Sequence, residues 1–92
     1  MAKYFKKPVV VEAELTETIL WAASNNWKAL PVWISEAYEK GELLFVVDHV
    51  EIKTLEGWVK ADTGHMIVKG VEGEIYPCRK DIFTKTHEYV DG

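Results

Sequence analysis

The sequence predicts an α+β domain in which two helices from the N-terminal half pack on a curled antiparallel sheet, as a meander or a partial barrel. The 92 residues suffice for one domain, 1–92, and 48% of them are hydrophobic. Apolar residues recur at helical spacing between residues 16 and 41. From residue 43 onward, short alternating segments are separated by glycine-containing turns. Such turns indicate antiparallel neighbours, because parallel strands need long crossovers.

The two helices are predicted from apolar spacing and from their end signals. Thr16 or Thr18 could cap the first, which is expected to end at about Asn26. Its apolar stripe contains Ile19, Leu20, Ala23 and Trp27. In "LPVWISEAYEKGEL", Pro31 fits the first turn of the second helix and Gly41 can take the left-handed conformation after it. Its core face contains Leu30, Ile34, Ala37 and Tyr38, with Trp33 at the edge.

Strands are predicted before the first helix and after the second. "KKPVVVEAEL" suits a strand because Val9–Val11 are β-branched and Pro8 is tolerated at a strand start or edge. Later strands are expected in "LLFVV", "HVEIKT", "WVKA", "HMIVK" and "EIYPC", with turns at "LEG", "DTG" and "GVEG". Pro77 is expected to stop its strand. "RKDIF" could form a short helical turn and "KTHEYV" a last edge strand.

Charge and cysteine content exclude several classes of protein. The net charge of −4 disfavours general nucleic-acid binding, although Arg79 and Lys80 leave room for a local basic patch. A single cysteine excludes an internal disulfide and a multi-cysteine zinc site. The N-terminal apolar run is short and is broken by Glu12 and Glu14, so neither a secretory signal nor a membrane span is expected. We predict a cytoplasmic protein.

The residues that could carry chemistry do not form a known motif. His49, His65, His87 and Cys78 match no compact zinc spacing, so neither a metal site nor a cofactor is predicted. Cys78 could act as a nucleophile with a histidine base, and the cations beside it would favour a thiolate. No serine–histidine–acid arrangement is recognisable. No enzyme is predicted, and a cysteine-dependent enzyme stays a remote alternative.

Aromatic residues mark the predicted contact surface. Trp21, Trp33 and Trp58 are candidates for exposed anchors, because tryptophan often dominates protein interfaces. The end of "GHMIVKGVEGEIYPCRKDIF" adds a polar and aromatic group of candidates: Tyr76, Cys78, Arg79 and Lys80. The rest of this stretch is interpreted as two strands joined by a glycine turn.

Three segments resemble a family of small phage and prophage proteins: "KYFKKPVVVEA", "IKTLEGWVKADTG" and "IVKGVEGEIYPCRKDIFTKTHE". That family's pattern includes a Lys-Lys-Pro-Val-Val start, a Pro-Gly-Asp-Tyr-Gly-like turn, then Gly-Glu-x-Tyr-Pro-Cys and Asp-Ile-Phe. At the turn this chain has Thr63, Gly64, His65 and Met66. Only the glycine matches, so no role of an acidic residue or a tyrosine is carried over. The resemblance implies phage origin and a bacterial cytoplasm, and it implies no reaction.

Two functions are therefore predicted. The leading one is a non-enzymatic phage or prophage accessory protein that binds a host or phage protein or associates with itself. The alternative is a small-ligand or nucleotide binder that sequesters a host signalling molecule, because aromatic stacking groups occur together with Arg79, Lys80 and N-terminal lysines.

Overall fold

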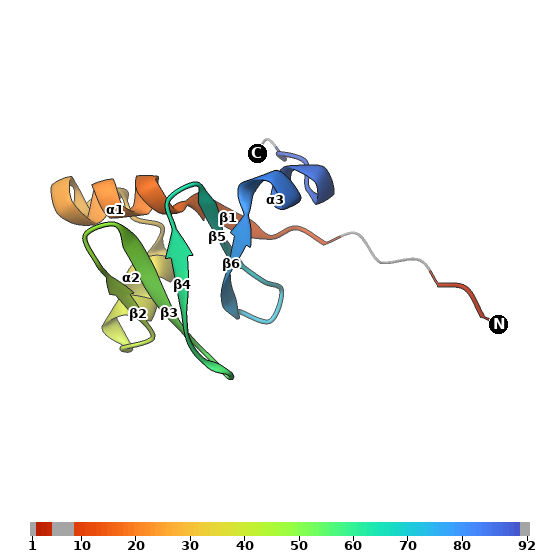
Figure 1. Cartoon of the computed structure of the whole chain (residues 1–92), viewed down its shortest axis with the longest axis horizontal. Helices are drawn as coiled ribbons and strands as arrows, with labels where there is room; N and C mark the ends of the chain where they lie inside the picture. The colour runs from red at the N-terminus through yellow and green to blue at the C-terminus, as the bar shows by residue number, and fades with distance from the viewer. Residues whose placement is uncertain (1, 5–8, 91–92) are drawn as a thin grey trace.

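The computed structural model describes residues 2–4 and 9–90, and it confirms an α+β fold with antiparallel strands (Figure 1). The elements, in chain order, are β1 (Glu12–Leu15), α1 (Thr16–Asn25), the 3-10 turn η1 (Trp27–Ala29), α2 (Val32–Glu39), β2 (Leu43–Phe45), β3 (His49–Thr54), β4 (Gly57–Asp62), β5 (His65–Lys69), β6 (Ile75–Arg79) and α3 (Lys80–Thr86).

The strands form two three-stranded sheets, in the orders β1-β5-β6 and β2-β3-β4. All four pairings within them are antiparallel. The chain changes sheets at Thr63 and Gly64, between β4 and β5, so the prediction that "DTG" is a hairpin turn between paired strands is wrong. Helix α2 packs on the β2-β3-β4 sheet, and α3 packs against β5 and β6 (Figure 1). Helix α1 contacts both sheets, through β3 and through β1 and β5. Among the described strands the sheets do not close into a barrel.

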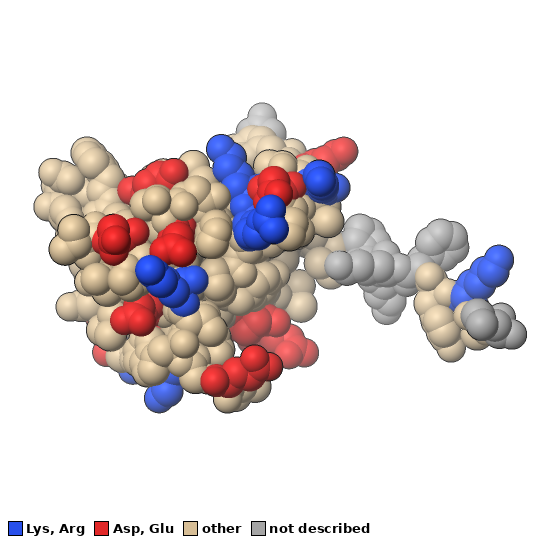
Figure 2. All heavy atoms as spheres, viewed as in Figure 1, with Lys and Arg blue, Asp and Glu red and all other residues tan. Residues whose placement is uncertain are grey.

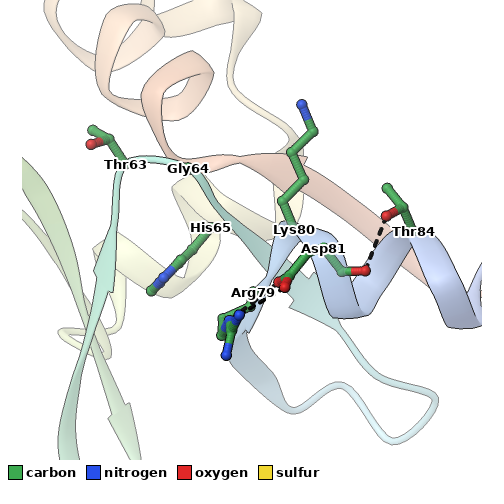
Figure 3. Close-up of a pocket in the computed structure, with 7 residues that line it drawn as sticks. All are labelled: Thr63, Gly64, His65, Arg79, Lys80, Asp81 and Thr84. Atoms are coloured by element: carbon green, nitrogen blue, oxygen red, sulfur yellow. Dashed lines mark hydrogen bonds and ion pairs between the residues drawn. The ribbon is translucent and has the colours of Figure 1, made fainter.

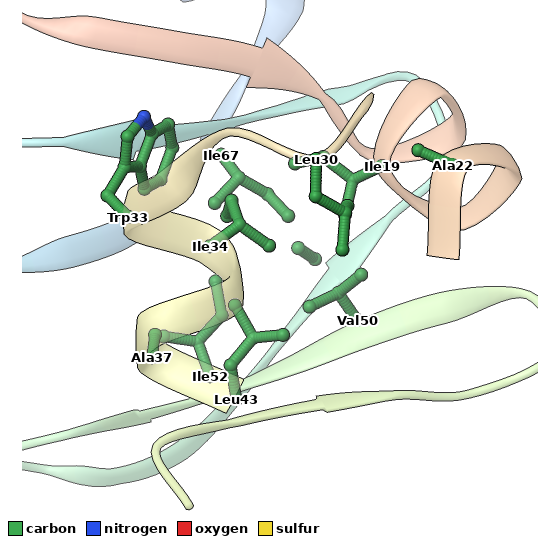
Figure 4. Packing of buried hydrophobic residues seen from close by; sticks show 11 residues of the cluster. Ile19, Ala22, Leu30, Trp33, Ile34, Ala37, Leu43, Val50, Ile52 and Ile67 are labelled. Atoms are coloured by element: carbon green, nitrogen blue, oxygen red, sulfur yellow. The ribbon is translucent and has the colours of Figure 1, made fainter. Parts of the chain in front are cut away.

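The hydrophobic core lies between the two N-terminal helices and the sheets. Figure 4 shows Ile34 and Ala37 of α2 facing Ile52 and Leu43 of the sheet, with Ile67 of β5 beside them. These side chains are buried, and burying one isoleucine stabilises the fold by roughly 1.5–3 kcal/mol. The core therefore joins the two sheets.

The first helix has the predicted span but a different start and stripe. Thr16 is its first residue rather than its cap, and its buried hydroxyl donates a hydrogen bond to the His65 carbonyl (3.1 Å). Ile19 is buried as predicted. Trp27 lies beyond the helix in η1, 42% exposed, so its predicted place on the stripe is wrong. The helix ends at Asn25, and the 3-10 turn changes the direction in which the next side chains point.

The second helix confirms most of its predicted features. Pro31 precedes its first residue, and Gly41 has φ +75°, as a left-handed end requires. Trp33 is only 9% exposed and belongs to the core, so the prediction that it is an exposed anchor is wrong. Tyr38, expected on the core face, lies at its margin and is exposed.

Several strand boundaries differ from prediction. β1 begins at Glu12, so Val9–Val11 precede it, and Pro8 lies outside the described residues. β2 ends at Phe45, because the following residues turn into β3. β6 continues through Pro77, which pairs with Ile67 in an edge strand where the missing N–H can point away from the ladder.

The C-terminal segment is helical where a strand was expected. The predicted turn at "RKDIF" is confirmed and extends to Thr86 as α3. The predicted edge strand over "KTHEYV" is therefore wrong, and residues 87–90 form no strand. No helix in the described part of the chain has the length and apolar content needed to cross a membrane.

The turn glycines are confirmed as left-handed, with φ +85° at Gly64 and +86° at Gly73. A Cβ at Gly64 would meet no atom within 4 Å, so backbone strain is the expected cost of a side chain there.

We predict that Gly64→Val lowers the free energy of unfolding by roughly 1–3 kcal/mol. Gly64→Asn should lower it by less, because asparagine tolerates the left-handed conformation. Chemical denaturation measures both, and equal stability of the two variants and the wild type would contradict the account.

Candidate functional site

An aromatic cluster lies beside β2, where the core meets solvent. The Trp27 ring approaches Tyr38 edge-on (5.3 Å between centroids) and Phe45 likewise (5.7 Å). Tyr38 and Phe45 are stacked at 5.1 Å. Each ring thus has two aromatic neighbours, which fix its orientation and make the cluster rigid.

Solvent reaches this cluster. Trp27 and Tyr38 are each 42% exposed, and Phe45 is half-buried. Leu44 lies between Leu43 and Phe45 on β2 and is 44% exposed. We call Trp27, Tyr38, Leu44 and Phe45 the β2 aromatic edge. Large apolar side chains that stay half-exposed on a rigid frame are typical of protein contact sites.

The other predicted anchors lie on separate elements. Trp21 is 58% exposed on α1, as the prediction requires. Trp58 is 47% exposed on β4, directly opposite Lys53 of β3, so both side chains point to the outer face of that sheet. Trp21, Trp33 and Trp58 therefore do not form a single site.

The predicted surface at the end of β6 is divided by strand alternation. Tyr76 and Cys78 share one face of β6, and Arg79 lies on the other. Partial burial of the Tyr76 phenol, with smaller contributions from Cys78 and Glu74, raises its pKa above the ordinary value. Arg79 and Lys80 are exposed, as expected of contact residues.

Cys78 has no histidine base in the adjacent strand. It is directly opposite Met66, whereas His65 is opposite Arg79, so the two potential partners point to opposite faces of the sheet. The thiol instead donates to the Arg79 carbonyl (3.6 Å). The strand geometry thus provides no pairing of His65 with Cys78 for nucleophilic catalysis.

Arg79 and Lys80 border a cavity of about 580 Å³ next to the β4–β5 turn. Figure 3 shows that the side chains of Arg79 and Lys80 point away from each other. The Arg79 guanidinium is held by Asp81 through two hydrogen bonds, of 2.7 and 3.2 Å. Figure 2 shows basic and acidic groups together where β6 meets α3. The cations therefore do not converge on one anion-binding point.

A larger groove of about 1010 Å³ lies between the two sheets. One face of α2, including Trp33 and Ala37, lines it together with Val59 of β4 and with Ile75 and Tyr76 of β6. Charged side chains of both signs also line it: Lys40, Lys53, Lys69, Glu36, Glu42, Glu56 and Glu74. Apolar lining with a few charged groups is typical of ligand sites, which occupy about 300–1,000 Å³.

The rings of His49 and His87 have structural neighbours. The ring of His49 bonds to Asp48 (2.7 Å), which lowers the pKa of that carboxyl, and the ring of His87 stacks on Phe83 at 4.2 Å. Within residues 2–4 and 9–90, no three histidine, cysteine, aspartate or glutamate side chains lie close enough together to hold a metal ion.

Comparisons with protein-family models, with curated proteins and with solved structures found no match to this chain. The resemblance to phage proteins therefore stays a prediction.

Sequence reasoning missed the β2 aromatic edge, because Trp27 and Tyr38 were both placed on core stripes. One signal was available: Tyr38 and Phe45 flank the short turn between the second helix and the next strand. Side chains on either side of such a turn are brought together when the strand packs under the helix. The position of Trp27 depends on the 3-10 turn, which no local pattern indicates.

The β4–β5 turn is attached to α1 through Glu17, whose carboxylate accepts a hydrogen bond from the Gly64 amide (3.0 Å). This bond, followed by weaker effects that include the Lys80 charge, lowers the pKa of Glu17 below its ordinary value of 4.5. The stabilisation of the folded state by the ionised Glu17 carboxylate is therefore complete above pH 4.5. It is lost as the pH falls through the pKa of Glu17 in the folded state.

We predict that Glu17→Gln lowers the melting temperature at pH 7 by no more than about 2–3 °C, because the carboxylate is exposed and screened. The difference from the wild type should shrink as the pH falls below 4.5. Thermal unfolding across pH 3–7 measures this, with the exposed Glu39→Gln as the control. If the difference in melting temperature between Glu17→Gln and the wild type grows toward low pH, the ionised Glu17 carboxylate is not what stabilises the turn.

Proposed function

We propose that this domain is a non-enzymatic binding module that docks a protein on the β2 aromatic edge. The observation that carries the proposal is the rigid cluster of Trp27, Tyr38 and Phe45, held by mutual contacts at 5.1–5.7 Å and still open to solvent. A pre-ordered aromatic surface loses little conformational freedom on binding, so more of its contact energy becomes affinity.

Tryptophan and tyrosine provide much of the energy in protein interfaces. Each can bury about 150–250 Å². With 42% of Trp27 and Tyr38 exposed, the two leave apolar area that a partner can cover. Leu44 adds exposed apolar area on the opposite, outer face of the same strand. The resemblance to phage proteins supports the further proposal that the module is a phage or prophage accessory protein in a bacterial cytoplasm.

The test is quantitative capture from bacterial lysate on the immobilised chain, together with light scattering of the purified chain. We expect at least one protein, or a second copy, to bind, and Trp27→Ala to weaken binding roughly thirtyfold, as loss of about 2 kcal/mol at an interface residue does. Tyr89→Ala is the control, because this exposed aromatic lies in the C-terminal segment away from β2.

A strictly monomeric chain with no captured partner would contradict the proposal. So would binding that Trp27→Ala leaves unchanged while the variant remains folded by circular dichroism.

The inter-sheet groove supports a second candidate, a small-ligand or nucleotide binder that sequesters a host signalling molecule. Tyr76 could stack on a base, and Lys40 and Lys69 could pair with phosphates. Lys69 also lies 3.7 Å from Glu12, an exposed pair that a ligand could replace at small cost.

A thermal-shift screen with mono-, di- and cyclic nucleotides tests this candidate. A nucleotide at a hundred times its dissociation constant adds about 2.7 kcal/mol of stability, which raises the melting temperature by more than 10 °C for a domain of this size. Tyr76→Ala should abolish the shift, with the outward-facing Trp58→Ala as the aromatic control. The absence of any shift at saturating concentrations would remove the candidate.

A further inference from the structure

We propose that a second copy of this chain occupies the β2 aromatic edge and pairs antiparallel with β2 about a two-fold axis at Leu44. The inference rests on the proposed function, because it names the occupant of the same surface. The resulting dimer would carry one continuous six-stranded sheet, β4-β3-β2 followed by β2-β3-β4 of the second copy.

Three of the four outer strands carry features that oppose pairing with another chain. β1 has Glu12 and Glu14, β4 has the Lys60–Asp62 ion pair (3.3 Å), and β6 has Pro77, which lacks an N–H. Charges and proline at an edge are the usual protection against strand addition. β2 consists of Leu43, Leu44 and Phe45 and has no such feature. Among the described strands it is thus the edge best suited to accept a partner.

The backbone of β2 presents hydrogen-bonding groups on the free side. The Val46 amide donates to the His49 carbonyl (2.9 Å), and the Lys53 amide donates to the Glu42 carbonyl (2.9 Å). The Glu42 carbonyl, the Val46 amide and, in the same register, the backbone groups of Leu44 therefore point toward β3. The Glu42 amide instead donates to the Ala37 carbonyl at the end of α2 (2.9 Å). Because these directions alternate along an antiparallel strand, Leu43 and Phe45 direct theirs away from β3.

This alternation sets one register for a symmetric pair. With the axis at Leu44, Leu43 is opposite Phe45 of the second copy, and Phe45 is opposite its Leu43. Each of these two pairs exchanges two N–H···O bonds, which gives four bonds in all. The two Leu44 side chains face each other in the close, non-hydrogen-bonded position between them. The free groups of the strand are thus self-complementary.

Charges do not oppose this register. Glu42 would be opposite Val46 of the second copy, so no like charges meet across the axis. In its own chain, Glu42 lies beside Lys53 of β3, which is of opposite sign.

The aromatic cluster supplies the buried area that a three-residue strand lacks. A stable interface buries at least about 1,000 Å² of surface in total. Two paired strands of three residues bury less than this by themselves. Phe45 lies on the inner face of β2, opposite the buried Val50, and Trp27 and Tyr38 surround it. Pairing of the two strands would bring both clusters to the same seam and remove their exposed rings from water.

The test uses charge substitutions at the proposed axis. L44K and L44E each put two like charges directly opposite each other, so each variant should be monomeric, with a dissociation constant at least tenfold above that of the wild type. An equimolar mixture of L44K and L44E should form a heterodimer, because opposite charges then meet. L55K is the matched control, since Leu55 is fully exposed at the β3–β4 turn, and it should dimerise as the wild type does.

Sedimentation velocity from about 1 to 100 µM measures all five samples, and thermal unfolding confirms that each variant is folded. A wild type that stays monomeric at 100 µM overturns the inference. A dimer that both variants retain, or two monomeric variants whose mixture does not associate, overturns the register at Leu44. If the wild type is monomeric but captures a lysate protein that Trp27→Ala releases, the inference fails while the proposed function stands.

Discussion

The change of sheets at Thr63 and Gly64 is the constraint on which the rest of the structure depends. Gly64 provides the left-handed conformation, the Glu17 carboxylate binds its amide, and the Thr16 hydroxyl binds the carbonyl of the next residue, His65. These contacts hold the turn against the start of α1. As a result β4 and β5 follow each other closely in the chain without joining one ladder, and six short strands form two sheets with four outer edges.

Two small sheets can share one core only if side chains from both reach it. Ile67 of β5 and Ile52 of β3 both do so, and Ile34 of α2 lies between them (Figure 4). At the far end the core stops at β2, and the rings of Trp27, Tyr38 and Phe45 close it. A domain of this size has too little interior to bury every large ring, so the residues that close the core are also those that a partner can cover.

The sequence was sufficient for the two N-terminal α-helices and the left-handed turns, because apolar spacing and glycine position are local properties. It was insufficient for the division into two sheets. Alternation along β4 and β5 indicates which side chains face inward, but it does not say which strand lies alongside. The same limit explains the tryptophans. Trp33 lies at the edge of its helical stripe and is buried through contacts from a distant sheet, whereas Trp27 leaves its stripe because α1 ends two residues before it.

Residue-resolved amide hydrogen exchange on β2, at low and high protein concentration, tests most directly whether this edge is a binding surface for a second copy. The Val46 amide is bonded within the chain and should be protected at both concentrations. The amides of Leu43 and Phe45 point away from β3, so they should exchange quickly in dilute solution and become protected, by tenfold or more, once the chain is concentrated. Equal exchange of Leu43 and Phe45 at both concentrations, in a sample that is dimeric by light scattering, would contradict the account.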